Sequence, residues 1–370
     1  MRIASLFVAI GFVALSAIAC AAAPKSLATE IKGKRAAILS YLAELPAQKK
    51  TLAGVQVNEY EVFIDCTSAD RLKVMTGERP AILGLELMNV IAYPPYASYL
   101  MDRALAQTSS GGLVTMSWHQ RNPVEICLRG EYYECAKKPM SAETLKAVLT
   151  PGTRENALWL SDVRAMAKVL HKLRAAGVVV LFRPYHEMNG GWFWWGKQDG
   201  LPALWDALFD ELVGREKLDN LIWVFSVDRE APDVARYFPK RHKPDIVGTD
   251  MYEPDPNTPK LPAAKTNLAK LSGTASFAVT EVGLAPGTKV LDEINPSFVL
   301  LWGDNLNIGW TWNGECPSCN KPEQVAAFFK LPRVVSLNDL PPAFRSTLAA
   351  HAVNRTPLHK ANPICPAKLH

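Results

Sequence analysis

Residues 161–189 read SDVRAMAKVLHKLRAAGVVVLFRPYHEMN, and this stretch decides the fold. Ser161 can cap a helix whose apolar residues recur at helical spacing as far as Leu173, and Gly177 ends that helix. Val178–Phe182 follows at once as a continuous apolar run, which is typical of a strand buried on both faces. A helix that leads directly into such a strand predicts parallel sheet structure with helical crossovers.

The same alternation extends from about residue 35 to residue 348, with no low-complexity linker. Further helices are expected at Lys34–Leu45, Ala97–Gln107 and Leu201–Leu212. Eight strands are expected, at Thr51–Val57, Pro80–Met88, Gly112–Trp118, Val178–Phe182, Leu221–Phe225, Asp245–Gly248, Phe277–Val279 and Ile308–Thr311. Eight strands in one unit of this size predict an α/β fold, a single (β/α)8 TIM barrel. A flat sheet with a second domain is the alternative.

Composition excludes several classes of protein. The 370 residues are 48% hydrophobic and 21% charged, as in ordinary globular proteins, and the net charge of +5 is spread along the chain. Because no block of Lys and Arg occurs, no nucleic-acid partner is expected. No Gly-rich phosphate loop follows a strand, so we expect no nucleotide and no cofactor. The ten Trp residues suit the apolar faces of sugar rings, although filling the core is their ordinary use.

The first 22 residues have the pattern of a signal peptide. Arg2 precedes an apolar run from Ile3 to Ile18, and small residues follow. The run is short for a membrane span, so no transmembrane segment is expected. Cys20 also stands in a loose lipobox, which leaves open a lipid anchor at Cys20 with cleavage just before it. We expect a secreted or periplasmic protein, or alternatively an outer-membrane lipoprotein, with residues 23–370 as the catalytic domain and the monomer as its state.

Six cysteines remain in the exported chain, and an even number predicts disulfides. They are Cys66, Cys127, Cys135, Cys316, Cys319 and Cys365. They allow 15 connectivities, and the local pair Cys127–Cys135 is the first expectation. A redox or half-zinc role for Cys316 and Cys319 is weakened by the absence of a second CxxC.

Polar residues that follow the expected strands converge at one place, because barrel sites lie at the carboxyl ends of the strands. Two glutamates stand out, Glu187 after the fourth strand and Glu281 after the seventh. These strands lie on opposite sides of the barrel mouth, so the two carboxylates are expected to face each other. A retaining glycosidase needs such a pair about 5–5.5 Å apart, one as acid and one as nucleophile. The charge on the nucleophile would help the acid to hold its proton.

Less specific explanations exist for each neighbouring residue. Glu187 alone would often be a salt-bridge partner of Arg183, and we place Glu86 outside the active site as a structural residue of the barrel. His119 and His186 are expected to contact substrate because both follow strands at the mouth. A metal held by these histidines and Asp250 needs a geometry that the sequence does not supply, so no metal is expected.

The strand-four segment RPYHEMNGGWFWWG, residues 183–196, resembles the signature of glycoside hydrolase family 26, in which endo-β-1,4-mannanases predominate. The resemblance implies that Glu187 is the acid/base, and that Asn189 and Trp192 line the sugar subsite beside the scissile bond. The segment TEVG, residues 280–283, resembles the strand-seven motif, which makes Glu281 the nucleophile.

Shorter matches extend the resemblance from the first strand to the eighth. Trp118 and His119 resemble the strand-three motif, whose His contacts the substrate. Asp250 and Tyr252 resemble strand-six residues that position the nucleophile and the sugar. Trp312 matches the strand-eight platform Trp, although Trp310 lies close to it. The substrate-binding residues so implied are Trp118, His119, Arg183, His186, Asn189, Trp192, Asp250, Tyr252 and Trp312.

Two features depart from the family pattern. Asn313 follows Trp312 where some relatives have Arg, which puts subsites far from the cleavage point in doubt. The insert Glu125–Lys138, with its two cysteines, falls in a loop that can reshape the cleft.

The resemblance implies retaining, endo-acting hydrolysis of β-1,4-mannosidic bonds in mannan-type polysaccharides. Mixed-linkage β-glucan and β-1,3-xylan remain as alternative substrates of the same catalytic pair. A carbohydrate-binding barrel without activity is a second class, and a polysaccharide lyase is a third, which would need a cluster of Arg and Lys that the strand ends lack. Subsite number and endo or exo action are left open.

Overall fold

The computed structural model describes residues 26–273, 275–306, 319–351, 356–359 and 365. Its strands are β1 (Thr51–Gln56), β2 (Ile82–Glu86), β3 (Leu113–Trp118), β4 (Val180–Pro184), β5 (Leu221–Asp228), β6 (Ile246–Met251), β7 (Ser276–Val282), β8 (Phe298–Leu301) and β9 (Val334–Val335). Its α-helices are α1 (Leu27–Glu44), α2 (Ser68–Thr76), α3 (Pro94–Ser109), α4 (Tyr132–Ala136), α5 (Ala142–Leu149), α6 (Arg154–Ala175), α7 (Leu201–Phe209), α8 (Lys260–Ser272), α9 (Thr288–Ile294), α10 (Pro322–Phe329) and α11 (Pro342–Leu348).

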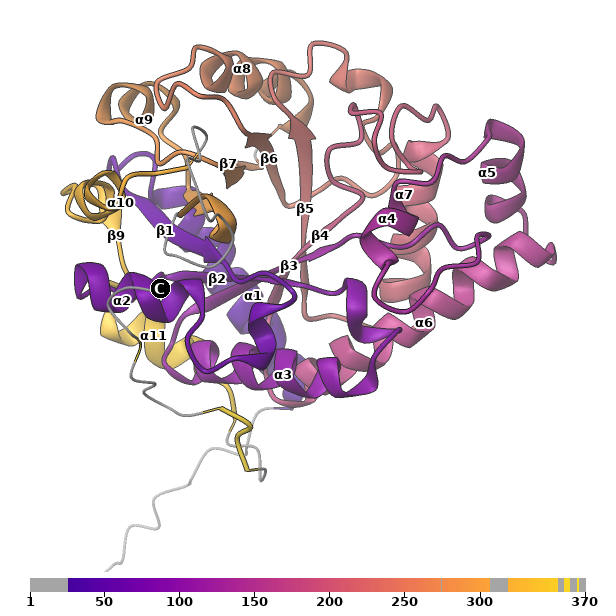
Figure 1. Ribbon diagram of the computed structural model, residues 1–370, viewed down its shortest axis with the longest axis horizontal. Helices are drawn as coiled ribbons and strands as arrows, with labels where there is room; N and C mark the ends of the chain where they lie inside the picture. Colours follow the sequence, from indigo (N-terminus) through magenta and orange to yellow (C-terminus); the bar gives the residue numbers. More distant parts are fainter. Residues whose placement is uncertain (1–25, 274, 307–318, 352–355, 360–364, 366–370) are drawn as a thin grey trace, which may run out of the picture.

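Strands β1 to β8 form a closed parallel barrel with helices around it (Figure 1). Each strand pairs with the next along the chain, and β1 closes the ring by pairing with both β2 and β8. The short strand β9 adds to β1 through Thr51 and Leu52. The predicted (β/α)8 barrel is confirmed.

Successive strand residues divide between two hydrophobic clusters, as the two-residue period of a strand requires. In β4, Val180 and Phe182 belong to the cluster between the strands and the outer helices, whereas Leu181 belongs to the cluster inside the barrel. All five residues of β4 are buried. A strand covered on both sides explains why this segment is an uninterrupted apolar run.

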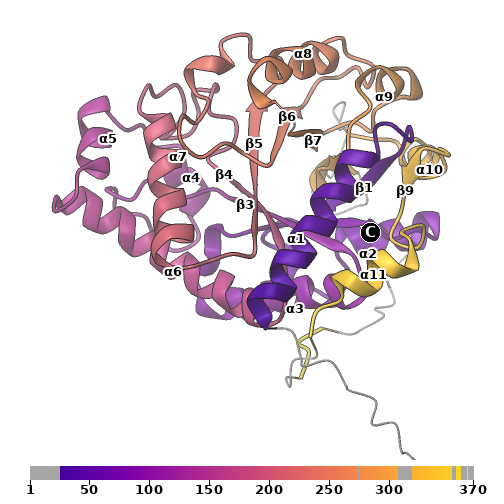
Figure 2. The same ribbon diagram turned by 180° about the vertical axis from the view of Figure 1, so that it is seen from behind.

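Helix α1 closes the amino-terminal end of the barrel. Its Ile38 and Leu42 share the inner cluster with Leu52, Ile82 and Leu113, which lie at the starts of their strands. Figure 2 shows this helix running across the barrel when the molecule is seen from behind. With that end filled by apolar side chains, the carboxyl ends of the strands remain open for polar ones.

Two element predictions need correction. The helix before β4 begins after Thr153, whose side chain accepts from the backbone N–H of Asn156, so Ser161 lies inside α6 rather than at its start. The eighth barrel strand is Phe298–Leu301, and the prediction that placed it at 308–311 was wrong. Residues 308–311 lie outside the described part of the chain.

Two disulfides join described residues. Cys127–Cys135, the local pair expected from the sequence, is confirmed, and Cys66 pairs with Cys365 across 299 residues. Cys316 lies outside the described residues. In the segments that the structure describes, no helix has the length and apolarity needed to cross a membrane.

Gly111, in the turn before β3, offers a stability test. Its φ is +80°, and a Cβ there would lie 2.7 Å from Cα and 2.8 Å from the carbonyl oxygen of Arg345. We expect Gly111→Ala to lower the free energy of unfolding by about 1–3 kcal/mol, because backbone atoms must move. Gly33, which is in α1 with nothing within 4 Å, is the control. Gly33→Ala should raise stability by about 0.5–1 kcal/mol. Urea unfolding measures the stability change in both variants. Equal changes would contradict the prediction that the positive φ and the close backbone of Arg345 make Gly111 necessary.

Candidate active site

The carboxyl ends of the barrel strands surround a cavity of ≈ 360 Å³. Five residues singled out from the sequence line it: His119, His186, Glu187, Tyr252 and Glu281. They come from β3, β4, β6 and β7 or from the residues that follow these strands. The barrel therefore brings together side chains that lie up to 162 positions apart in the sequence.

A strained turn after β4 places Glu187. Tyr185 and Glu187 have φ values of +47° and +55°, which side chains other than glycine rarely adopt. The backbone N–H of Glu187 donates to the carbonyl of Ser226 in β5 at 2.9 Å, which holds the turn against the neighbouring strand. Strain of this kind costs of order 1–3 kcal/mol per residue and is concentrated at functional sites.

The carboxyl group of Glu187 is buried among acidic neighbours. Trp192 donates its indole N–H to Oε2 of Glu187 at 2.7 Å. Burial raises the pKa of Glu187 well above its usual value, and the negative charges of Asp250 and Glu281 raise it further. Glu187 therefore holds a proton under conditions in which an exposed glutamate has lost it.

Glu281 has the opposite environment, because two donors face its oxygens. Arg183 donates to Oε1, and the Tyr252 hydroxyl donates to Oε2. Arg183 also donates to Asp250 at 2.8 Å, so one guanidinium bridges two buried carboxylates. Asp250 in turn accepts from Ser226 and Thr280, each at 2.7 Å. The guanidinium and the hydroxyl together hold the Glu281 carboxylate in one direction.

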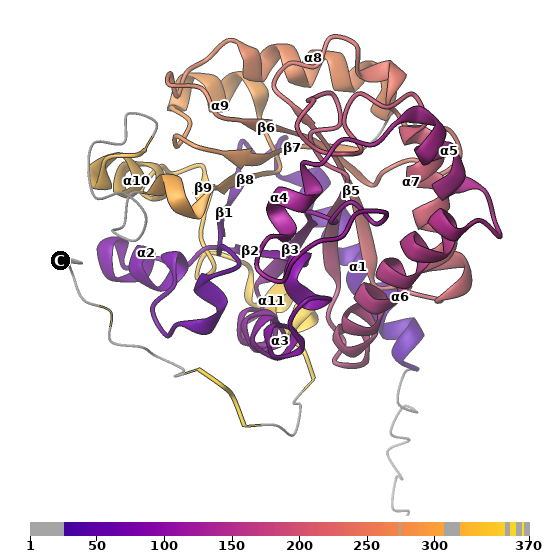
Figure 3. The ribbon, with the colours of Figure 1, turned by 45° about the vertical axis from the view of Figure 1, so that its right-hand side comes forward.

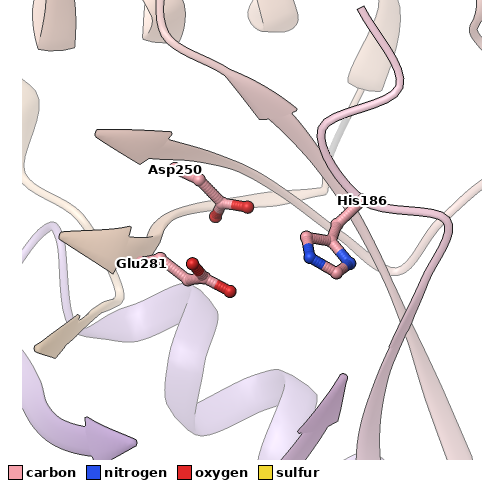
Figure 4. Close-up of side chains that lie close together, drawn as sticks. All are labelled: His186, Asp250 and Glu281. Carbon is pink, nitrogen blue, oxygen red and sulfur yellow. The ribbon is translucent and has the colours of Figure 1, made fainter. Parts of the chain in front are cut away.

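Within the described residues, one set of side chains has the spacing of a metal site. Ligand atoms of His186, Asp250 and Glu281 lie within 4.8 Å of one another (Figure 4). However, Arg183 already donates to both carboxylates, so the positive charge that a metal would supply is present in the protein. A second cation there would be repelled, and the group does not fit a metal.

Arg183 should be essential for stability at this site. Its removal leaves Asp250 and Glu281 buried without their cation, and breaking a buried ion pair costs about 3–5 kcal/mol. We expect Arg183→Met to lower the free energy of unfolding by that amount in urea titrations. Arg154→Met, which removes a side chain 74% exposed and 3.7 Å from Glu155, should change it by less than about 1 kcal/mol. Equal losses in the two variants would contradict the bridging role.

A chain of hydrogen bonds links the two histidines to a third glutamate. Glu86 accepts from Nδ1 of His119 at 2.7 Å and from the backbone N–H of His119 at 2.9 Å. The ε2 nitrogens of His119 and His186 are 3.0 Å apart. Burial lowers the pKa of His119, but the charge of Glu86 and its hydrogen bond outweigh that effect and raise the pKa. The pKa of His186 is lowered by burial and by the positive charges of Arg183 and His119.

These opposite shifts favour His119 as the donor and His186 as the acceptor between the two ε2 nitrogens. Glu86 had been left outside the site on sequence grounds, and this was wrong, because it lines the cavity and holds His119 in place.

Trp118 does not face the cavity, and its prediction as a substrate contact was wrong. The side chain is fully buried in the cluster between strands and helices, with its ring 6.5 Å from that of Tyr185. Because neighbouring strand residues point to opposite faces, Trp118 turns outward where Ser117 and His119 turn toward Glu86.

Asn189 also has a different place from the one predicted. Its amide donates to the carbonyl of Asp228 and accepts from the backbone N–H of Asp228, both at 2.8 Å. Asn189 therefore ties the loop after β4 to the end of β5, and it is not among the residues that line the cavity. Trp192, by contrast, is 39% exposed beside Glu187.

The platform expected at Trp312 lies outside the described residues. Trp302 directly follows β8, lines the cavity and packs edge-on against Tyr252 with ring centroids 6.5 Å apart. With β8 ending at Leu301, Trp302 is the tryptophan that follows the eighth strand, the place where the sequence analysis expected a platform for the sugar.

Several lining residues were missed by the sequence analysis. Asn58 and Tyr60, just after β1, both donate to Asp304, which follows β8, and form one wall of the cavity. The rule that polar residues follow each strand would have found these two if it had been applied to β1. Tyr133 and Phe193 form part of another wall and follow no strand directly.

Comparisons with known proteins show which proteins the whole chain is similar to. A mannan endo-1,4-beta-mannosidase of Thermothelomyces thermophilus is 29% identical over 317 residues, which are 82% of this chain and 61% of that protein. The structure of GH26A from a Muricauda species has a TM-score of 0.72 at 28% identity, with 84% of this chain and 97% of that one covered. A beta-mannanase from a symbiotic protist of the termite Reticulitermes speratus, complexed with gluco-manno-oligosaccharide, has a TM-score of 0.68 at 28% identity and covers 80% of this chain and 91% of its own.

The chain spans between about half and two thirds of the length of three curated relatives that it matches. The profile of Glycosyl hydrolase family 26 matches residues 29–330, which is most of the chain. The chain belongs to glycosyl hydrolase family 26.

Proposed function

We propose that this protein hydrolyses β-1,4-mannosidic bonds inside mannan-type polysaccharides, with retention of the anomeric configuration. The observation that carries the proposal is the pair of glutamates that line one cavity and have different hydrogen-bond partners. Glu187 has a raised pKa and no cationic partner among its hydrogen bonds, whereas Glu281 is bound by Arg183 and Tyr252. Such a difference assigns an acid and a nucleophile.

In the first step, an oxygen of Glu281 attacks the anomeric carbon while Glu187 gives its proton to the glycosidic oxygen. The bond between that oxygen and the anomeric carbon breaks, and the sugar remains as an ester of Glu281. Arg183 and Tyr252 hold the attacking carboxylate in direction. As Glu281 loses its charge, the pKa of Glu187 falls, because one of the charges that raised it is gone.

In the second step, Glu187 takes a proton from water. The water oxygen bonds to the anomeric carbon, the ester bond breaks, and Glu281 is released as a carboxylate. The hydrogen bond from Trp192 to Oε2 of Glu187 restrains the side chain, so the same group can serve both steps.

The choice of mannan rests on relatives. Mannan endo-1,4-beta-mannosidases recur among the similar proteins, and one similar structure holds a gluco-manno-oligosaccharide. The experiment is hydrolysis of a panel of mannan, galactomannan, lichenan and β-1,3-xylan by the purified protein. Release from the mannans with the β-anomer first in the NMR spectrum supports the proposal. Release from lichenan or xylan alone would show that the substrate is that glycan and not mannan. Release of the α-anomer first would overturn the retaining mechanism.

We also propose that the protein is exported. The apolar run after Arg2 and the two disulfides between described residues both suit an oxidising compartment. Mass spectrometry of the mature amino terminus after expression in a Gram-negative host distinguishes the outcomes. Cleavage near residue 22 with no lipid supports a secreted or periplasmic enzyme, acylated Cys20 supports a lipoprotein, and an uncleaved chain would contradict export.

A further inference from the structure

The insert after β3 forms a small covalent ring against the cleft. Cys127 and Cys135 close it, and α4 lies at its end; Figure 3 shows α4 in front of the barrel strands in that view. Backbone bonds attach α4 to its surroundings: the N–H of Trp194 donates to Ala136 at 2.9 Å, and that of Asn122 donates to Cys135 at 3.3 Å. The ring is therefore fixed at its Cys135 end, against the loop after β4.

Tyr133 is the residue of this ring that reaches the catalytic cavity. Its aromatic ring packs edge-on against His119 and Phe193, with centroid distances of 5.4 Å and 6.2 Å. The side chain is nevertheless 41% exposed. Among the described residues, no group makes a hydrogen bond with its hydroxyl, which is thus available to a ligand in the cavity.

The hydroxyl of Tyr133 is a neutral donor at any pH at which the enzyme would work. Burial, followed by the negative charges of Glu187 and Glu281, raises the pKa of Tyr133 to about 12. A phenol that faces a sugar can donate to a hydroxyl oxygen while its ring covers an apolar face.

The neighbours of Tyr133 indicate that it lies on the same side of the cleft as Glu187. Phe193, which it contacts, is next in sequence to Trp192, and Trp192 donates to Glu187. The general acid protonates the oxygen of the departing sugar, so residues gathered around the acid face that sugar. Asn58, Tyr60 and Asp304 form the wall that β1 and β8 supply.

From these contacts we propose that Tyr133 binds the departing sugar and sets the preference for chains that extend past the cleavage point. The Cys127–Cys135 disulfide holds Tyr133 in position, so the subsite depends on the oxidised state of this pair. The inference rests on the proposed glycosidase function and adds a specificity residue to it.

The test compares two substrates, mannopentaose and 2,4-dinitrophenyl β-mannobioside, whose good leaving group needs no bound sugar. We expect Tyr133→Ala to lower kcat/KM for mannopentaose about 10- to 100-fold, and Tyr133→Phe about 3- to 10-fold. Both variants should stay within about 2-fold of the parent on the aryl substrate. Leu128→Ala, in the same ring but 63% exposed and away from the cavity, is the control and should change neither rate.

The disulfide is tested by replacing both Cys127 and Cys135 with serine. The double variant should lose activity on mannopentaose but keep it on the aryl substrate, and adding Tyr133→Ala to it should cost little more. Equal losses on both substrates, or fully additive losses, would overturn the proposal. If the parent protein hydrolyses neither substrate, the proposed function itself fails, and that outcome is separate from an unchanged preference in the variants.

Discussion

Glu281→Ala is expected to lower kcat/KM for mannan by about 10⁴-fold or more, because the variant lacks the carboxylate that we propose attacks the anomeric carbon. The aryl β-mannobioside should lose as much, since a good leaving group does not replace a nucleophile. Added azide should restore turnover and yield the α-glycosyl azide, because a small anion then attacks from the side that the carboxylate left.

Folding must be separated from chemistry in this variant, because Arg183 loses one of its two acceptors. Glu281→Gln keeps an oxygen for Arg183, so a variant that melts like the parent yet is inactive isolates the loss of the nucleophile. Glu293→Gln, at an exposed site in α9, controls for loss of a surface charge. Turnover above one hundredth of the parent rate in a folded Glu281→Gln protein would refute the assignment.

Glu187→Gln should give a different pattern, which depends on the leaving group. Hydrolysis of mannan is expected to fall about 10²- to 10⁴-fold because the departing sugar no longer receives a proton. The first step on the dinitrophenyl substrate should remain fast, so a burst of dinitrophenol should precede slow turnover. Azide should accelerate that turnover and give the β-glycosyl azide.

The pH dependence of activity tests the same role of Glu187. In the proposed mechanism Glu187 acts in its protonated form, and its pKa is raised, so the parent activity on mannan should be present below that pKa and be lost as the pH rises through it. In Glu187→Gln this alkaline limb should disappear. An unchanged limb, or an equal loss on both substrates, would point to another residue as the acid.

The barrel was predictable from the sequence, and so was the position of Glu187 and Glu281 at its mouth, because both depend on local patterns. A strand buried on both faces is a run of apolar residues, as in β4, and a polar residue that follows it must lie at the barrel mouth. The eighth strand could not be predicted in this way. Phe298–Leu301 is only four residues long, and hydrogen-bonded register with β1, rather than composition, distinguishes it from another apolar segment.

The errors at the site have a different cause, which is side-chain direction. Trp118 and His119 are adjacent, yet one faces the helices and the other the cavity, so closeness in sequence to a functional residue misleads by one position. Tyr133 lies 15 residues beyond the end of β3, and only the folded ring returns it to the cleft. Asn189 was misplaced because an amide can brace a loop as readily as it binds a sugar.

The Cys66–Cys365 bond has a consequence for damage to the folded molecule. It joins the segment that follows the first strand to one near the end of the chain, with 299 positions between its partners. Nearly the whole barrel thus lies within one covalent circle. A protease that cuts a single peptide bond anywhere inside this circle opens it without freeing a fragment, so a nicked enzyme keeps all its strands tethered until the bond is reduced.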